Sequence, residues 1–106
     1  MSRAGDREQA FVCVIEARLH VEDSGSLKSK RKIVRSLKDS VRKRFGASVS
    51  EIGGKDTWQR ATLLIALTGD EGVAARADEV ERFIAARLPD GVVFERHLRS
   101  LEEIRD

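Results

Sequence analysis

The chain of 106 residues has one cysteine, one proline, one tryptophan and no tyrosine. A single thiol, Cys13, excludes an internal disulfide and a cysteine-based zinc site. No apolar run approaches the ~20 residues of a membrane-spanning helix, and the polar N-terminal stretch has no signal-peptide core. We therefore expect a cytoplasmic protein without a membrane segment. Apolar residues make up 41 % of the chain, enough for one domain with a modest core.

Positive charge is concentrated in residues 26–45, which hold nine of the twenty basic side chains and a single acid. Since the whole chain carries only +2, the remaining segments are acidic on balance. Apolar residues recur in this stretch at spacings of three, four and seven, which predicts one amphipathic helix. Ser26 stands at the N-cap position and Gly46 at the left-handed C-cap position. The apolar stripe comprises Leu27, Val34, Leu37, Val41 and Phe45.

Cations crowd the first two turns of this predicted helix, where the helix dipole disfavours them. Lys30 also falls on the apolar stripe. The sequence leaves two interpretations open. One is a solvated basic face. The other is a phosphate site formed by the free backbone N–H groups of the helix start and the cations around them. The candidate phosphate-binding residues are Ser26, Lys28, Lys30, Arg31, Lys32, Arg35, Lys38, Arg42 and Lys43.

The rest of the chain divides into a loose N-terminal arm at residues 1–9 and further elements of one domain at 10–106. Every second residue from Phe11 to Val21 is apolar, which predicts the first strand with Cys13 inward as a buried, inert thiol. Asp70 suits the N-cap of a second helix. The predicted strands are 10–21, 47–52, 58–68 and 92–98, the second helix is 71–88, and 100–106 is a helical turn or tail.

The order β-α-β-β-α-β predicts an α+β fold, the ferredoxin-like plait. Four antiparallel strands then carry two helices on one face, with the first and third strands central. This topology places the start of the basic helix, the hairpin near residues 53–58 and the Pro89 turn at one end. Trp58, Gln59 and Arg60 therefore lie beside the lysine cluster. A stacking side chain beside phosphate-binding cations suits looped or single-stranded RNA; the alternative is that Trp58 only packs over the hairpin.

The other face of the predicted sheet lacks aromatic residues apart from Trp58 at its margin, so base stacking on the open sheet is unsupported. Four outward positions are instead apolar and form a patch that favours cover by another surface. Our hypothesis is a homodimer or partner contact through this patch. The patch comprises Val12, Val14, Leu64 and Ala66.

Two segments of the sequence resemble the YlxP-like family of small bacterial proteins, whose function is unknown. The first is the Ser-Leu-Lys-x-Lys-Arg helix start at residues 26–31, and the second is the Asp-x-Trp-Gln-Arg segment at 56–60. Ser29 and Thr57 depart from the family's usual acidic residue and leucine. The resemblance spans about residues 11–98 and implies a ferredoxin-like fold and a bacterial cytoplasmic protein. The family's genes often lie near those of translation factors, which suggests work on RNA or the ribosome.

An enzymatic function has little support in the residues. Four side chains have suitable chemistry, namely His20, His97, Glu51 and Asp56. The two histidines lack a metal-ligand spacing, and no Ser/His/Asp order or glycine-rich phosphate loop is present. We therefore expect a non-enzymatic RNA- or ribosome-associated binding protein without cofactor or metal. The alternative is a protein–protein assembly module.

Overall fold

The computed structural model describes residues 9–21, 25–54, 57 and 59–106, so the predicted arm at 1–9 lies almost wholly outside the described residues. The four strands form one antiparallel sheet in the order β2-β3-β1-β4, which confirms that the first and third strands are central. The elements are β1 (Phe11–His20), α2 (Leu27–Phe45), β2 (Ser48–Gly53), β3 (Arg60–Gly69), α3 (Val73–Arg87), β4 (Val92–Ser100) and α4 (Leu101–Arg105).

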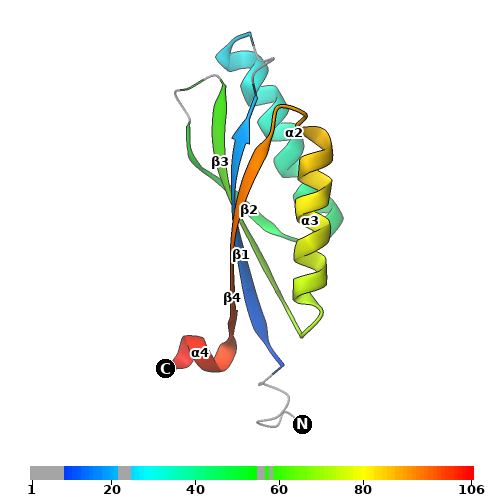
Figure 1. Cartoon of the computed structure of the whole chain (residues 1–106), viewed down its shortest axis with the longest axis vertical. Helices are drawn as coiled ribbons and strands as arrows, with labels where there is room; N and C mark the ends of the chain where they lie inside the picture. Colours follow the sequence, from blue (N-terminus) through cyan, green and yellow to red (C-terminus); the bar gives the residue numbers. More distant parts are fainter. Residues whose placement is uncertain (1–8, 22–24, 55–56, 58) are drawn as a thin grey trace.

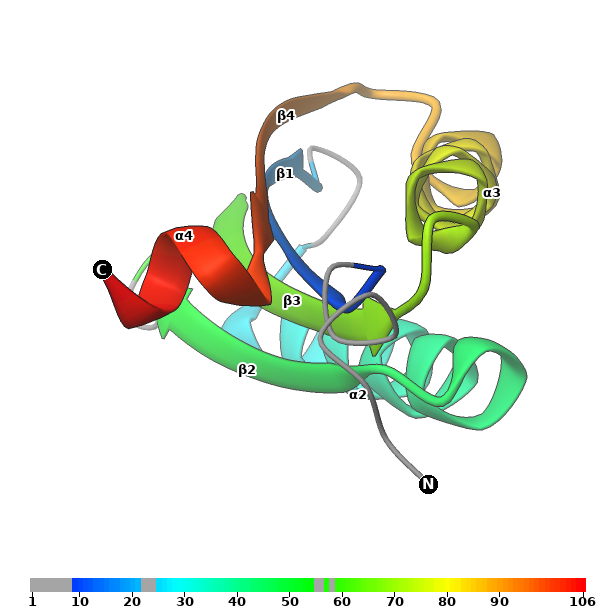
Figure 2. The same cartoon turned by 90° about the horizontal axis from the view of Figure 1, so that it is seen from below.

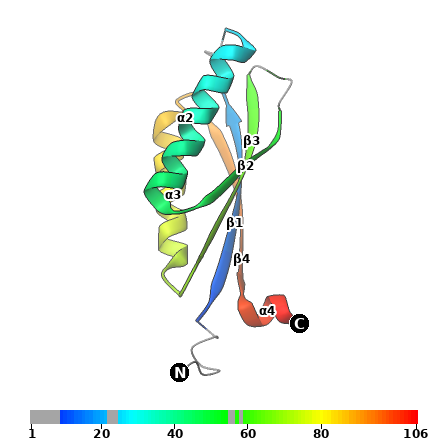
Figure 3. The same ribbon diagram turned by 180° about the vertical axis from the view of Figure 1, so that it is seen from behind.

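Two layers make up the molecule. Helices α2 and α3 lie side by side on one face of the sheet (Figures 1 and 3). The short helix α4 projects from the end of β4 on the side away from them (Figure 2). Alternate residues of β1 and β3 point to the two long helices and are buried, from Cys13 to Leu19 and from Ala61 to Leu67. The predicted inward face of the first strand, including the buried Cys13, is therefore confirmed.

Helix α2 begins and ends where the sequence predicts. The hydroxyl of Ser26 accepts a hydrogen bond of 3.1 Å from the backbone N–H of Ser29, which satisfies one unpaired donor of the first turn. Gly46 has φ 65°, and its N–H donates to the Arg42 carbonyl over 3.0 Å. No acidic residue stands in the first turn, so the cations there face the positive end of the helix dipole without compensation.

Most boundaries lie within one or two residues of the prediction, and two of the differences have a clear physical reason or consequence. Helix α3 begins at Val73 with Gly72 at the N-cap, so the prediction of Asp70 as N-cap is wrong. Asp70 instead closes the preceding turn, because its carboxylate accepts from the Gly72 N–H over 2.8 Å and its carbonyl from the Val73 N–H over 3.0 Å. At the other end of the chain, β4 continues to Ser100, two residues beyond the predicted strand.

The last helix, α4, begins with a capping box. Ser100 accepts from the Glu103 N–H over 3.1 Å, and the Glu103 carboxylate accepts from the Ser100 N–H over 2.8 Å. This backbone hydrogen bond lowers the pKa of Glu103, because it stabilises the ionised carboxylate. The Ser-x-x-Glu spacing is therefore the start of a short helix. The sequence alone predicts either a helical turn or a tail here.

Candidate phosphate-binding surface

Three backbone segments meet at one end of the sheet, the upper end in Figure 1. The N–H of Val21 donates to the Gln59 carbonyl over 2.8 Å, and the N–H of His20 donates to the Gly91 carbonyl over 3.0 Å. Lys30, near the start of α2, reaches Gly54 of the β2–β3 hairpin. The predicted juxtaposition of the helix start, the hairpin and the Pro89 turn is therefore confirmed.

Lys30 does not face outward. Its side chain is 1 % exposed, and its ammonium donates to the carbonyls of Gly54 and Arg60 over 2.7 and 3.3 Å. The carboxylate of Glu51 lies 3.7 Å away. These three oxygens surround the ammonium and leave it turned away from solvent. We therefore correct the prediction and remove Lys30 from the phosphate-binding set, because the ammonium instead joins α2 to the hairpin.

Arg42 is also engaged inside the protein. Its guanidinium donates to the Val49 carbonyl over 2.6 Å and to the Asp39 carboxylate over 3.4 Å. The first bond ties the end of α2 to the edge strand β2. A phosphate would have to share this guanidinium with the sheet, so Arg42 is a weaker candidate than its position on the helix suggests. The Ser26 hydroxyl is likewise used as the helix cap.

Arg44 lies over the rings of Phe45 and Phe83, and the other six cations of α2 are differently placed. Across the described part of the chain, their side chains make no hydrogen bond or ion pair with a protein group. All are exposed except Lys38, which is half-buried. Among the described residues, therefore, no carboxylate pairs with them. These residues, the free α2 cations, are Lys28, Arg31, Lys32, Arg35, Lys38 and Lys43.

Two adjoining depressions run along α2. One, of about 410 Å³, lies on the basic face of the helix, and the other, of about 360 Å³, lies between α2 and α3. Lys32, Ser36 and Ser40 line both depressions and stand between them. We call the two depressions together the α2–α3 groove. Its lining comprises Lys32, Ile33, Arg35, Ser36, Leu37, Asp39, Ser40, Lys43, Arg87 and Leu88.

Sequence reasoning missed three polar groups of this groove: Ser36, Ser40 and Arg87. The i, i+4 spacing of Lys32, Ser36 and Ser40 puts them on one helical face, and this signal was available in the sequence. The contribution of Arg87 could not be predicted from the sequence, because this residue belongs to α3 and reaches the groove only through the packing of the two helices.

The hairpin residues occupy a different surface. Trp58 lies outside the described residues, whereas Gln59 and Arg60 are exposed. Arg60 pairs with His20 in the sheet register and lines a depression of about 520 Å³ together with Arg18, Asp90 and residues of the hairpin. That depression includes no side chain of α2. The structure thus brings Arg60 to the same end as the α2 start, but not into the α2–α3 groove.

The groups considered for catalysis are scattered. Within the described ranges no three His, Cys, Asp or Glu side chains come together as a metal site would require. His97 is exposed and lies 3.1 Å from Glu95, while Glu51 is beside Lys30 and Asp56 lies outside the described residues. Burial raises the pKa of the Cys13 thiol, although the nearby Arg96 acts against this. None of the described helices has the length and apolar character needed to cross a bilayer.

The fold and the groove define a small α+β protein whose basic helix packs on a four-stranded antiparallel sheet. The family model DUF503, described as a protein of unknown function, matches residues 12–96. The chain is also 38 % identical over 65 residues to the uncharacterized protein YlxP of Bacillus subtilis (strain 168), which covers 61 % of this chain and 70 % of that protein. The chain therefore belongs to the DUF503 family, and the resemblance seen in the sequence is confirmed.

One solved structure supports the fold alone. The de novo designed protein Foldit4 superimposes with a TM-score of 0.52 over 86 % of this chain and 97 % of its own, at 16 % sequence identity. A likeness at this identity shows that the arrangement of elements recurs, and it carries no information on function.

Proposed function

We propose that this chain is a non-enzymatic RNA- or ribosome-associated binding protein that holds phosphates along α2. The observation that carries the proposal is the set of free α2 cations, which have no partner among the described residues. Cations at i, i+4, such as Lys28 with Lys32 and Arg31 with Arg35, repel one another within a helix. Their cost to the isolated protein is offset when an external polyanion binds there.

The length of the basic face suits an extended ligand. From Lys28 to Lys43 the helix rises about 22 Å, at ~1.5 Å per residue. A run of phosphates along one nucleic-acid strand can follow such a face, whereas a single small anion would engage only one or two of these side chains. Electrostatic attraction to the face is independent of base sequence.

We infer that the sheet order and the two covering helices form the ferredoxin-like plait, and that the protein works in the bacterial cytoplasm. RNA-recognition domains of this topology stack bases on aromatic residues of the two central strands. The described open face has no Phe, Tyr or Trp on these strands, which favours the helical layer as the binding side.

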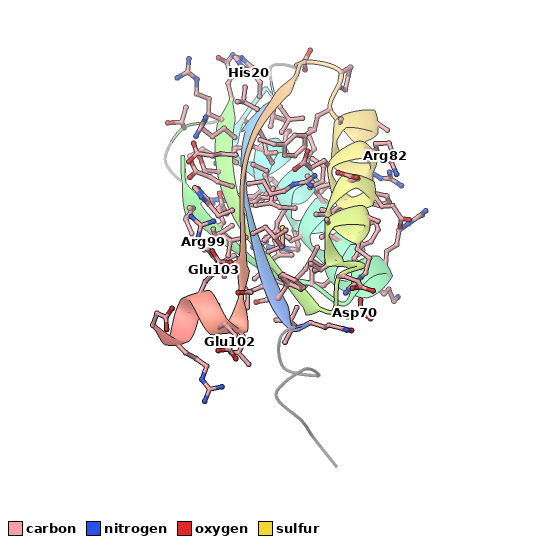
Figure 4. The ribbon with its side chains drawn as sticks, turned by 60° about the horizontal axis from the view of Figure 1, so that its bottom comes forward. His20, Asp70, Arg82, Arg99, Glu102 and Glu103 are labelled. Atoms are coloured by element: carbon pink, nitrogen blue, oxygen red, sulfur yellow. The ribbon has the colours of Figure 1, made fainter. Side chains whose placement is uncertain are left out.

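Crosslinking in cells tests the proposal directly. The variant Lys32→Gln with Arg35→Gln should recover much less crosslinked RNA than the unaltered protein. The matched control removes two charges elsewhere, with Arg82→Gln and Arg99→Gln, whose side chains project from α3 and β4 (Figure 4). Equal RNA recovery from both double variants would contradict the proposal.

A second candidate function is a protein–protein assembly module that uses the open sheet face. Leu64 is 36 % exposed and precedes Ala66 by two residues on β3, where Ala66 pairs with Val14. Val12, Val14 and Ala66 are half-buried. Apolar exposure of this kind favours cover by another surface. A homodimer through this face should dissociate when Leu64→Lys places a charge in its centre. Sedimentation of the unaltered chain as a monomer at high micromolar concentration would exclude the homodimer.

A further inference from the structure

The α2–α3 groove has an apolar side as well as a basic one. Ile33 is 38 % exposed at its rim, and Leu37 and Leu88 form its floor. The cations Lys32, Arg35 and Lys43 lie along the other side, on α2. A site for phosphates alone has no use for an exposed isoleucine, because phosphate oxygens gain nothing from apolar contact.

Arg87 adds a flat surface to the same groove. Its guanidinium carbon lies 3.5 Å from the ring centroid of Phe83, and its Nη1 donates to the Phe83 carbonyl over 3.2 Å. These two contacts hold the guanidinium in place. Arg87 is exposed and lines the depression that also contains Ile33. A ligand can therefore approach the guanidinium from the side away from Phe83, and nucleobases stack on guanidinium planes in RNA complexes.

We propose that the α2–α3 groove takes an unpaired nucleotide of single-stranded RNA. Its base lies against Ile33 and the guanidinium of Arg87, and the flanking phosphates lie on Lys32, Arg35 and Lys43. The hydroxyls of Ser36 and Ser40, which can donate or accept, face the edge of the base or the ribose. This inference rests on the proposed function and deepens it, because it specifies single strands over duplex.

The chemistry of the groove separates the two forms of RNA. In a duplex the bases are paired and stacked, so a protein meets mainly phosphates, ribose hydroxyls and base edges. Only an unpaired base can place its face on Ile33 and Arg87. An acidic peptide would also satisfy the cations, but its carboxylates sit on flexible aliphatic stems and do not use a guanidinium plane.

The test compares one oligoribonucleotide as a single strand and annealed to its complement, at several salt concentrations. The single strand should bind about fivefold or more tightly, the lower end of what one stacked base contributes. Ile33→Ser and Arg87→Ala should each remove most of this preference. Their controls are Ile52→Ser, an exposed isoleucine of β2 outside the groove, and Arg82→Ala on the outer side of α3 (Figure 4).

Three outcomes are informative. Loss of the preference in the groove variants, with controls unchanged and all variants melting at similar temperatures, supports the inference. Equal binding of both RNA forms, unaffected by Ile33→Ser but still steeply salt-dependent, overturns the inference and leaves phosphate binding by α2 standing. Binding of polyglutamate with no salt-dependent binding of RNA overturns both.

Discussion

The ammonium nitrogen of Lys30 lies 2.7 Å from the carbonyl oxygen of Gly54, 24 residues further along the chain. Because of this contact, the basic residues of the Ser-Leu-Lys-x-Lys-Arg helix start, at residues 26–31, fall into two groups. Lys30 holds the β2–β3 hairpin against α2 and is buried, whereas Lys28 and Arg31 on the same turns are exposed. The contacts of Lys30 therefore account for its place in the fold. Lys28 and Arg31 have no such structural role in the part of the chain that the structure describes, and we attribute them to binding.

Lys30→Ala should destabilise the fold by about 2–4 kcal/mol. The change leaves two carbonyls without their donor and the Glu51 carboxylate without its ion pair, and unpaired buried polar groups are costly. The free energy of unfolding in urea measures the effect. Lys28→Ala, on the exposed face, should stay within about 0.5 kcal/mol of the unaltered protein. Equal stability of the two variants would show that the buried ammonium of Lys30 does not stabilise the packing of the hairpin against α2.

Gly54→Ala should cost at least about 2 kcal/mol. Gly54 has φ 75°, and an added Cβ would lie 2.7 Å from the Arg60 carbonyl oxygen, in the same place where Lys30 donates. The control is Gly25→Ala, since Gly25 has no positive φ and a Cβ there meets nothing within 4 Å. Urea unfolding should separate the two. An unaffected Gly54→Ala protein would mean that the hairpin can move away from α2 at little cost.

Cys13 should react slowly with thiol reagents in the folded protein. Its side chain is fully buried, and burial raises the pKa of the thiol, so less reactive thiolate forms. Labelling at mildly alkaline pH should accelerate strongly in urea. Because the folded-state pKa is raised, the stability contribution of Cys13 is complete at neutral pH. It falls as the pH rises past the ordinary thiol value of about 8.5. Rapid labelling without denaturant would contradict this placement.

Much of the fold was predictable because periodicity reports burial directly. The stripe from Leu27 to Phe45 predicted α2 with both of its caps, and the apolar residue at every second position from Phe11 to Leu19 predicted the buried face of β1. The predicted start of α3, at residue 71, was two residues too early. Asp70 has the chemistry of an N-cap, but its hydrogen bonds close a turn before the helix, and composition does not separate these two uses.

The candidate site was predictable only in part. Charge density identified α2, and the topology placed its start beside the hairpin. Which cations are free could not be read from the sequence, since the fate of Lys30 and Arg42 depends on carbonyls of other elements. The groove itself depends on how α2 packs against α3, so neither Arg87 nor the exposed side of Ile33 was assigned.

The most direct measurement of the central claim is the salt dependence of RNA binding. For single-stranded RNA the log of the affinity should fall with log salt by about 0.7 per phosphate contact. Lys32→Gln with Arg35→Gln should therefore reduce the slope by about 1.4, whereas Arg82→Gln with Arg99→Gln should leave it unchanged. Equal slopes for the two double variants would contradict the claim that α2 binds phosphates.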